Sequence, residues 1–310
     1  MLVQDTSFLK NEIMRLKKEK DVVILAHNYE IPDVQDVADF TGDSLGLSKL
    51  AATVQQKTIL FCGVHFMAET AAIISPEKRV LLPSLEAGCS LSDSITADEL
   101  RNWKKQHPDA ISVGYVNTTA EIKSELDYCC TSSNAVNVVN SIPKDKEILF
   151  LPDMFLGSYV AKMTGRNNMH IWAGECHVHA GITPEDVTKK LNSMHDTEFL
   201  IHPECSCTTP MMYDVADGSY ENNKVSILST EGMLNYASAS KSKNFVVATE
   251  TGILYKMKKD NPDKTFVPAS EKAECQYMKM ITLEKVHDAL VREKNVITVP
   301  KKIADKARLA

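Results

Sequence analysis

Three cysteines occupy matching places in the chain and are the clearest candidates for chemistry. Cys89, Cys176 and Cys275 each follow a short apolar run and a small polar loop, in "KRVLLPSLEAGCS", "NMHIWAGECHVH" and "KTFVPASEKAECQ". Thiolates are good ligands for zinc and for iron–sulfur clusters. Three thiolates on a [4Fe–4S] cluster would leave one iron without a protein ligand, and an open position lets a metal act as a Lewis acid. Spacing alone leaves three possibilities: a catalytic cluster, a zinc site, or no metal.

The other five cysteines have no such counterparts in the chain. Cys62, Cys129 and Cys130 are expected to be small buried side chains. Cys205 and Cys207 form a Cys-Ser-Cys pair with the option of metal or redox chemistry, but no second pair has the spacing of a zinc site. Because disulfides are rare in the cytosol, we expect thiols or metal ligands rather than structural disulfides.

A second group of candidate residues lies in polar loops that directly follow apolar runs. Its members are His27 and Tyr29, Tyr115 and Asn117, and His202 and Glu204. Glu204 is a candidate general base, and burial would raise its pKa whereas a nearby histidinium would lower it. His179, three residues beyond Cys176, is expected either to contact substrate or to shield a group bound by the cysteines.

Hydroxyl groups precede helical runs in "FTGDSLGLS", "CCTSSNAV" and "LSTEGML". Such residues commonly cap helices. A helix N-terminus also offers free N–H groups and partial positive charge, which suits a phosphate or a carboxylate. The residues expected to bind substrate in this way are Ser44, Ser132, Ser229 and Thr230.

These candidate residues take similar positions in three parts of the chain because the sequence contains an internal repeat of about 90 residues. Each copy runs from an apolar strand into a polar loop, then through a second strand, a helix and a cysteine phrase. Asn28, Asn117 and Glu204 take matching positions, so an acid replaces an amide in one copy only. The third copy carries an insertion of roughly ten residues after Glu204, expected in "MMYDVADGSYENNK" at 211–224.

Short strands alternating with helices predict an α/β protein with parallel sheets. We expect three related small α/β domains, each with about three strands, around a pseudo-threefold axis. Ligands of such sheets bind beyond the carboxyl ends of the strands, so the active site and any cluster belong at the centre. The alternative is one large irregular α/β domain. The expected domains are 1–90, 91–177 and 178–284, with 285–310 packing back on the first.

Composition narrows the class of partner. The 310 residues are 44% hydrophobic and 25% charged, as in ordinary soluble proteins, and the net charge of −6 argues against nucleic acid as a partner. No apolar run approaches the ~18–20 residues that span a bilayer, so no membrane partner is expected. The first residues lack the features of a signal peptide, which predicts a cytoplasmic protein.

Several long motifs closely resemble the quinolinate synthase family, in that family's order, from about residue 13 to residue 300. They are "ILAHNYEIPDVQDVADFTGDSLGLS", "YVNTTAEIKSELDYCCTSSNAV", "GECHVH", "HPEC", "STEGM" and "CQYMKMITLEKV". The resemblance implies a transferase that condenses iminoaspartate with dihydroxyacetone phosphate to quinolinate, phosphate and water, on the way to NAD. It also implies three related α/β domains and a [4Fe–4S] cluster on three cysteines, which match Cys89, Cys176 and Cys275.

The resemblance further implies roles for the polar residues. Tyr29, Tyr115, His202 and Glu204 are the expected catalytic residues, with Glu204 as an acid/base group. The expected substrate contacts are His27, Ser44, Asn117, Ser132, His179, Ser229 and Thr230. Some relatives have a C-x-x-C-x-x-C at the third ligand, whereas "AECQYMKM" has one cysteine, so a regulatory disulfide there is not expected. In the family, iminoaspartate comes from L-aspartate oxidase, which implies a functional link.

Three rival functions remain at this stage. An electron-transfer or cluster-carrier protein would not need serines, tyrosines and a glutamate around its cluster. A hydro-lyase could use the same open iron on a hydroxy acid. A binding protein without metal would contain neither iron nor sulfide.

Overall fold

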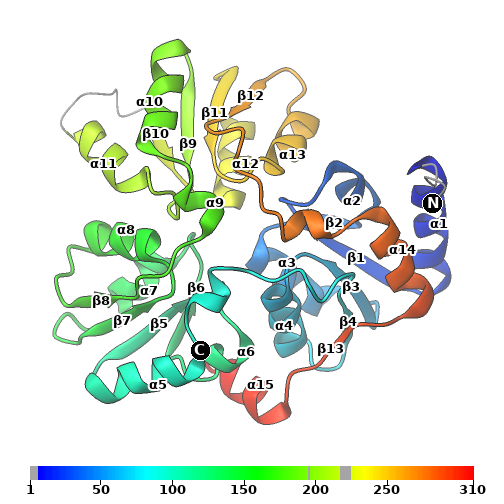
Figure 1. Ribbon diagram of the computed structural model, residues 1–310, viewed down its shortest axis with the longest axis horizontal. Helices are drawn as coiled ribbons and strands as arrows, with labels where there is room; N and C mark the ends of the chain where they lie inside the picture. The colour runs from blue at the N-terminus through cyan, green and yellow to red at the C-terminus, as the bar shows by residue number, and fades with distance from the viewer. Residues whose placement is uncertain (1–5, 195, 217–224) are drawn as a thin grey trace.

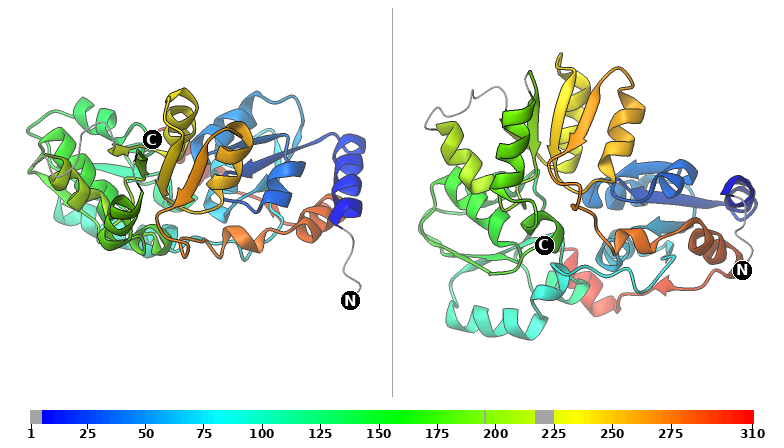
Figure 2. Two further views of the ribbon diagram at one scale, coloured as in Figure 1. Left: turned by 90° about the horizontal axis from the view of Figure 1, so that it is seen from above. Right: turned by 45° about the horizontal axis from the view of Figure 1, so that its top comes forward.

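The computed structural model describes residues 6–194, 196–216 and 225–310 and shows an α/β protein built on three sheets. The sheets are arranged around one central point (Figure 1). The prediction of several small α/β units with parallel sheets, rather than one irregular domain, is confirmed. Seen from above, the assembly is flatter than it is wide (Figure 2).

The three sheets repeat one strand order. The parallel strands run β4-β3-β1-β2 in the first sheet, β8-β7-β5-β6 in the second and β12-β11-β9-β10 in the third. The first sheet also carries β13, which pairs antiparallel with β4. The strand bounds are β1 Val22–His27, β2 Phe40–Gly42, β3 Thr58–Cys62, β4 Arg79–Leu81, β5 Ile111–Tyr115, β6 Tyr128–Cys130, β7 Ile148–Leu151, β8 Met169–Ile171, β9 Glu198–Ile201, β10 Val225–Ile227, β11 Asn244–Ala248, β12 Thr265–Pro268 and β13 Val296–Ile297.

The expectation of about three strands in each unit was wrong, because each unit has a fourth parallel strand. These additional strands, β2, β6 and β10, are three residues long and lie at the edges of their sheets. Apart from Gly42 and Cys130, their residues are exposed or only partly buried, so they lack the continuous apolar run of strands covered on both faces. Each leads directly into one of the hydroxyl-bearing loops.

The central strands form the cores. All six residues of β1 are buried, as are all four of β7. The helices cover both faces of the sheets, which explains why the strands are almost entirely apolar. The helices are α1 Thr6–Glu19, α2 Pro32–Val37, α3 Ser44–Thr53, α4 His65–Ile74, α5 Ala97–Gln106, α6 Ala120–Lys123, α7 Ala135–Ser141, α8 Met154–Thr164, α9 His177–Ala180, α10 Pro184–Ser193, α11 Thr208–Ala216, α12 Thr230–Ala239, α13 Ile253–Asp260, α14 Leu283–Arg292 and α15 Lys301–Ala307, with 3-10 turns at Ser92–Ser94 and Met278–Met280.

The last segment of the chain ties two units together. Helix α14 packs against α1, and the two lie together at one end of the molecule (Figure 2). Helix α15 packs against α6 of the second unit and α4 of the first. Arg308 donates a hydrogen bond of 2.8 Å to the carbonyl of Ile73, and the amide of Cys129 donates to Ala310 at 3.2 Å. The domain boundaries at residues 90, 177 and 284 stay predictions.

Two further expectations concern the insertion in the third unit and the absence of a membrane-spanning segment. The insertion expected at 211–224 lies partly outside the described residues, which resume at 225. Among the helices of the described ranges, none is long and apolar enough to cross a membrane.

Candidate active site

Loops at the carboxyl ends of all three sheets line one central cavity. The predicted site residues that line it are His27, Tyr29, Ser44, Cys89, Tyr115, Asn117, Ser132, Cys176, His179, His202, Glu204, Thr230 and Cys275. Ser229 is the exception and does not line the cavity. Its hydroxyl instead accepts a hydrogen bond of 3.2 Å from the amide of Gly232 and caps α12. The other two predicted serines differ: Asp43 caps α3, leaving the Ser44 side chain on the cavity wall, and Ser132 lies in the turn before α7.

The three repeated cysteines meet at this cavity in matching local structures. Each is half-buried, follows the last parallel strand of its unit, and precedes a short helical turn. In each case the cysteine carbonyl accepts the amide four residues onward, at 3.0 Å for Cys89, 2.8 Å for Cys176 and 3.1 Å for Cys275. The amide of Ser92 also approaches the Cys89 sulfur at 3.5 Å. Amides directed at sulfur are a feature of iron–sulfur sites.

Burial raises the pKa of the Cys89 thiol and raises that of Cys275 to about 11. Cys176 lies close to both thiols, and the negative charge of its thiolate raises their pKa values further. A thiol that ionises poorly in water becomes a strong ligand when a metal takes the place of its proton. The positions of Cys89 and Cys275 therefore suit the ligands of a metal group better than they suit free thiolates.

The remaining cysteines lie away from the cavity lining. None of the eight cysteines, all within the described ranges, forms a disulfide. Cys62 and Cys130 are buried in their sheets, as expected, and Cys129 is half-buried. Cys205 and Cys207 are fully buried in the third core, where the Cys205 thiol donates to the carbonyl of Ala248 at 3.0 Å.

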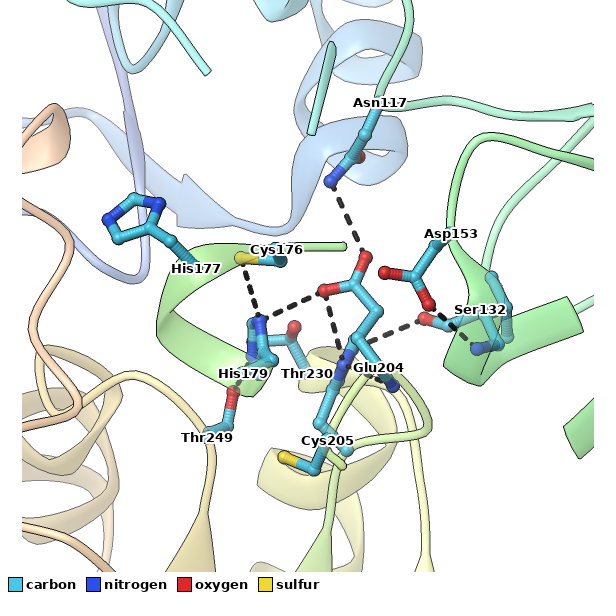
Figure 3. A network of polar contacts seen from close by, with 12 residues as sticks. Asn117, Ser132, Asp153, Cys176, His177, His179, Glu204, Cys205, Thr230 and Thr249 are labelled. Carbon is cyan, nitrogen blue, oxygen red and sulfur yellow. Dashed lines mark hydrogen bonds and ion pairs between the residues drawn. The ribbon is translucent and has the colours of Figure 1, made fainter. Parts of the chain in front are cut away.

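Glu204 occupies the centre of the polar part of the cavity (Figure 3). Only 2% of the residue is exposed, and its carboxylate lies 3.0 Å from Nδ1 of His179 and 3.5 Å from Nδ2 of Asn117. Burial acts to raise the pKa of Glu204, but the charge and hydrogen bond of His179 outweigh it and lower the pKa to about 2. The carboxylate is therefore ionised at neutral pH.

His179 connects Glu204 to the cysteine end of the cavity (Figure 3). Its Nδ1 lies 3.2 Å from the Cys176 sulfur, and its Nε2 lies 2.8 Å from the hydroxyl of Thr249. Burial acts to lower the pKa of His179, but the neighbouring Cys176 and Glu204 raise it above its usual value. His179 and Glu204 therefore form a buried ion pair beside a proposed metal ligand. The donor atoms of Cys176, His179 and Glu204 also lie within 4.8 Å of one another, a donor set that zinc accepts.

Two further histidines of the cavity lining, His27 and His202, are neutral. Burial lowers the pKa of His27 and of His202 to about 3 in each case. Both accept at Nδ1 the amide two residues onward, at 3.2 Å for His27 and 3.4 Å for His202. A neutral ring that accepts at Nδ1 carries its proton on Nε2, and His202 presents Nε2 to Ser132 at 3.4 Å.

The two tyrosines predicted to be catalytic, Tyr29 and Tyr115, keep their protons. Burial raises the pKa of the phenol of Tyr29 and of Tyr115. The Tyr29 hydroxyl lies 2.6 Å from Thr249 and 3.3 Å from Thr230, and Tyr115 forms a hydrogen bond with Glu204. Both phenols are thus neutral groups able to donate a proton or a hydrogen bond.

Sequence reasoning missed two buried acids beside the ligand loops. Asp153 and Glu250 take matching places after β7 and β11, and both are almost fully buried. Glu250 accepts the amide of Cys275 at 3.1 Å and forms an ion pair with Lys279 at 2.7 Å. Asp153 caps α8, where its carboxylate accepts the amide of Leu156 at 2.7 Å. The spacing of the internal repeat places Asp153 and Glu250 at matching positions, and this spacing was the signal in the sequence that could have paired them. The first unit has Val64 at the matching position.

Comparisons with known proteins agree with the motifs. A family model described as Quinolinate synthetase A protein matches residues 11–310. The chain is 53% identical over 302 residues to a quinolinate synthase of Thermus thermophilus, covering 97% of this chain and 95% of that protein. It is 54% identical over 271 residues to that of Mycobacterium sp. (strain KMS), covering 87% and 80%. For a quinolinate synthase of Mycobacterium tuberculosis the identity is 50% over 297 residues, covering 96% and 85%.

Proposed function

The chain belongs to the quinolinate synthase family, and from this premise we propose that it condenses iminoaspartate with dihydroxyacetone phosphate to quinolinate, phosphate and water. It is an enzyme of quinolinate synthesis in NAD biosynthesis. The observation that carries the proposed chemistry is the convergence of three repeated cysteines and a buried set of acid and base groups on one cavity. Anaerobic turnover with the two substrates, with quinolinate as the measured product, is the test.

Several finer assignments belong to this proposal. The reaction makes the enzyme a transferase. We assign it to the cytoplasm and expect a functional link to L-aspartate oxidase as the source of iminoaspartate. We expect no nucleic acid partner, which the net charge of −6 supports. The same proposal includes the division into units at 1–90, 91–177 and 178–284, with 285–310 as a C-terminal segment.

Cys89, Cys176 and Cys275 are the proposed ligands of a [4Fe–4S] cluster. The fit rests on three half-buried thiols in matching turns on one cavity wall, with no fourth cysteine among the described residues that line it. When bound, a cluster with three protein ligands supplies an open iron that acts as a Lewis acid toward a substrate oxygen.

Glu204 and His179 are the proposed proton-transfer pair. Glu204 is ionised and can accept a proton. His179, which forms an ion pair with the Glu204 carboxylate, is charged and can donate a proton. General acid and base groups are needed for imine formation and for loss of water and phosphate. Because both groups are buried and already in contact, neither has to be desolvated when substrate binds.

The neutral groups around this pair are suited to orienting an anionic substrate. Tyr29 and Tyr115 present phenols, and His27 and His202 present imidazoles, all uncharged and buried. Such groups donate hydrogen bonds to carboxylate or phosphate oxygens without adding charge repulsion among themselves. Burial also limits water, which would hydrolyse iminoaspartate.

Alanine replacement of Ser44 or Ser132 is expected to weaken catalysis without affecting the cluster. Each hydroxyl lies on the cavity wall, so we expect KM to rise or kcat to fall about tenfold, the scale of ~1–1.5 kcal/mol for one polar contact. Steady-state kinetics and the visible spectrum of the same sample would measure both effects.

Ser229→Ala is the matched control for these variants. Ser229 is a helix cap outside the cavity lining, so its loss should lower stability by about 1 kcal/mol and leave KM unchanged. If Ser44→Ala and Ser132→Ala have the kinetics of Ser229→Ala, the two cavity serines do not bind substrate.

Glu250 is proposed to position the third ligand loop. Glu250→Leu should lose the acceptor for the Cys275 amide, whereas Glu250→Gln keeps an oxygen there. Both variants leave Lys279 without its buried partner, so they form a matched pair. We expect the leucine variant to release iron to a chelator at least about tenfold faster than the glutamine variant. The loss of a group that orients a metal ligand typically weakens metal binding by about 10–100-fold. Equal release rates would exclude a positioning role for the hydrogen bond.

A further inference from the structure

A second set of metal-binding side chains lies at the other end of the second sheet from the cysteines. It consists of His107 at the end of α5, Glu147 just before β7 and His170 in β8. Nδ1 of His107 and Nε2 of His170 approach the same carboxylate oxygen, Oε2 of Glu147, at 3.2 and 3.4 Å. The two rings lie side by side, with centroids 4.2 Å apart. Three donor atoms from three elements thus converge on one place.

The backbone holds these three side chains in position. The amide of Ile111 donates to the Glu147 carbonyl at 2.9 Å, which fixes Glu147 at the edge of β5 and β7. His170 pairs with Leu149 in the parallel register of β7 and β8, so the side chains at 147, 149 and 170 share one face of the sheet.

Helix α5 is anchored over that same face by an aromatic pair. Trp103 lies one helical turn before His107, and its ring centroid is 5.6 Å from that of Trp172, which lies two residues after His170. Trp precedes His along the helix and follows it along the strand, so the Trp–Trp and His–His contacts form together when the two elements pack in opposite directions. This packing of the two histidines does not depend on a ligand.

We propose that His107, Glu147 and His170 bind a zinc ion. Zinc takes imidazole nitrogen and carboxylate oxygen at about 2.0–2.2 Å in tetrahedral geometry, which places neighbouring donor atoms about 3.3 Å apart. The two nitrogen–oxygen separations of 3.2 and 3.4 Å already have this value. All three donor atoms lie within 4.8 Å of one another, so a small rotation of the rings completes the set.

The site is open to solvent on the side away from the sheet. The side chains of His107, His170 and Glu147 are 24%, 38% and 51% exposed, which gives a metal a path of entry and leaves room for water as a fourth ligand. The bound ion would join the end of α5 to β7 and β8. It has no contact with the cavity, so this proposal is independent of the proposed reaction.

The test uses the untagged, cluster-loaded chain under anaerobic conditions, so that the cavity cysteines are already occupied. Zinc is titrated into the wild type, His170→Gln and Glu147→Gln, and bound zinc is counted after gel filtration. His287→Gln is the matched control, because His287 is a histidine of α14 on a different unit. Thermal unfolding is followed in each sample with and without zinc.

We expect the wild type and His287→Gln to bind about one more zinc per chain than the two site variants at micromolar zinc. The site variants should bind at least about a hundredfold more weakly, because even a partner that only orients a ligand contributes 10–100-fold. Zinc should raise the unfolding temperature of the wild type and the control alone. Equal zinc binding by wild type and His170→Gln, or no binding at micromolar zinc, would show that the three side chains form only a hydrogen-bonded cluster. Quinolinate formation should be unchanged in all variants.

Discussion

Serine at any one of Cys89, Cys176 and Cys275 is expected to abolish both cluster assembly and quinolinate formation. The three thiols are the only cysteines among the described residues that line the cavity, so none of the other cysteines is placed to replace a lost ligand. A hydroxyl is a far poorer ligand for iron than a thiolate. Iron and sulfide per chain, the visible spectrum and anaerobic turnover should be measured on one preparation of each variant.

Cys129→Ser is the control for this series, since Cys129 is also half-buried but lies outside the cavity lining. It should keep its cluster and its activity. Full iron content together with full turnover in any of the three ligand variants would mean that the cysteine concerned does not hold the cluster.

Glu204→Gln is expected to keep the cluster and to reduce quinolinate formation by at least about a hundredfold, within the ~10²–10⁴-fold range of general acid–base catalysis. Glutamine preserves the shape and the contact with Asn117 but cannot accept a proton. It also leaves His179 without its buried anionic partner, which lowers the tendency of that ring to hold a proton. Both members of the proton-transfer pair are thus affected by one substitution.

Glu175→Gln provides the comparison for Glu204, because Glu175 lies next to Cys176 but is exposed and outside the cavity lining. Its activity should match that of the wild type. Turnover of Glu204→Gln within a few-fold of the wild type, at equal iron content, would assign proton transfer to Tyr29, Tyr115 or His202 and leave Glu204 a positioning role.

The sequence repeat predicted the architecture because each unit alternates short apolar strands with helices. It also predicted which loops would meet, since the carboxyl ends of parallel strands share one edge. Strands β2, β6 and β10 were missed because three-residue edge strands with half-exposed side chains carry no apolar signature. Ser229 was grouped with Ser44 and Ser132 by its place before a helix, yet side-chain direction decides whether such a hydroxyl caps the helix or faces a cavity.

The electrostatics of the site required three-dimensional information. The sequence left open whether burial or a histidinium controls the pKa of Glu204, and the contact with His179 at 3.0 Å decides in favour of the histidinium. The repeat offset pairs Asp153 with Glu250, but the support that Glu250 gives to the Cys275 amide could not be predicted, because the backbone partner of an acid is known only from the structure. Site residues were predictable by type, and their protonation states were not.

Quinolinate formation and cluster content, measured together on anaerobically purified protein, test the central claim most directly. We predict a brown protein with about four iron and four sulfide per chain that forms quinolinate from iminoaspartate and dihydroxyacetone phosphate. Quinolinate formation by protein that contains zinc but no sulfide would instead favour the site of Cys176, His179 and Glu204. Fully cluster-loaded protein that forms no quinolinate from the two substrates would contradict the proposed function.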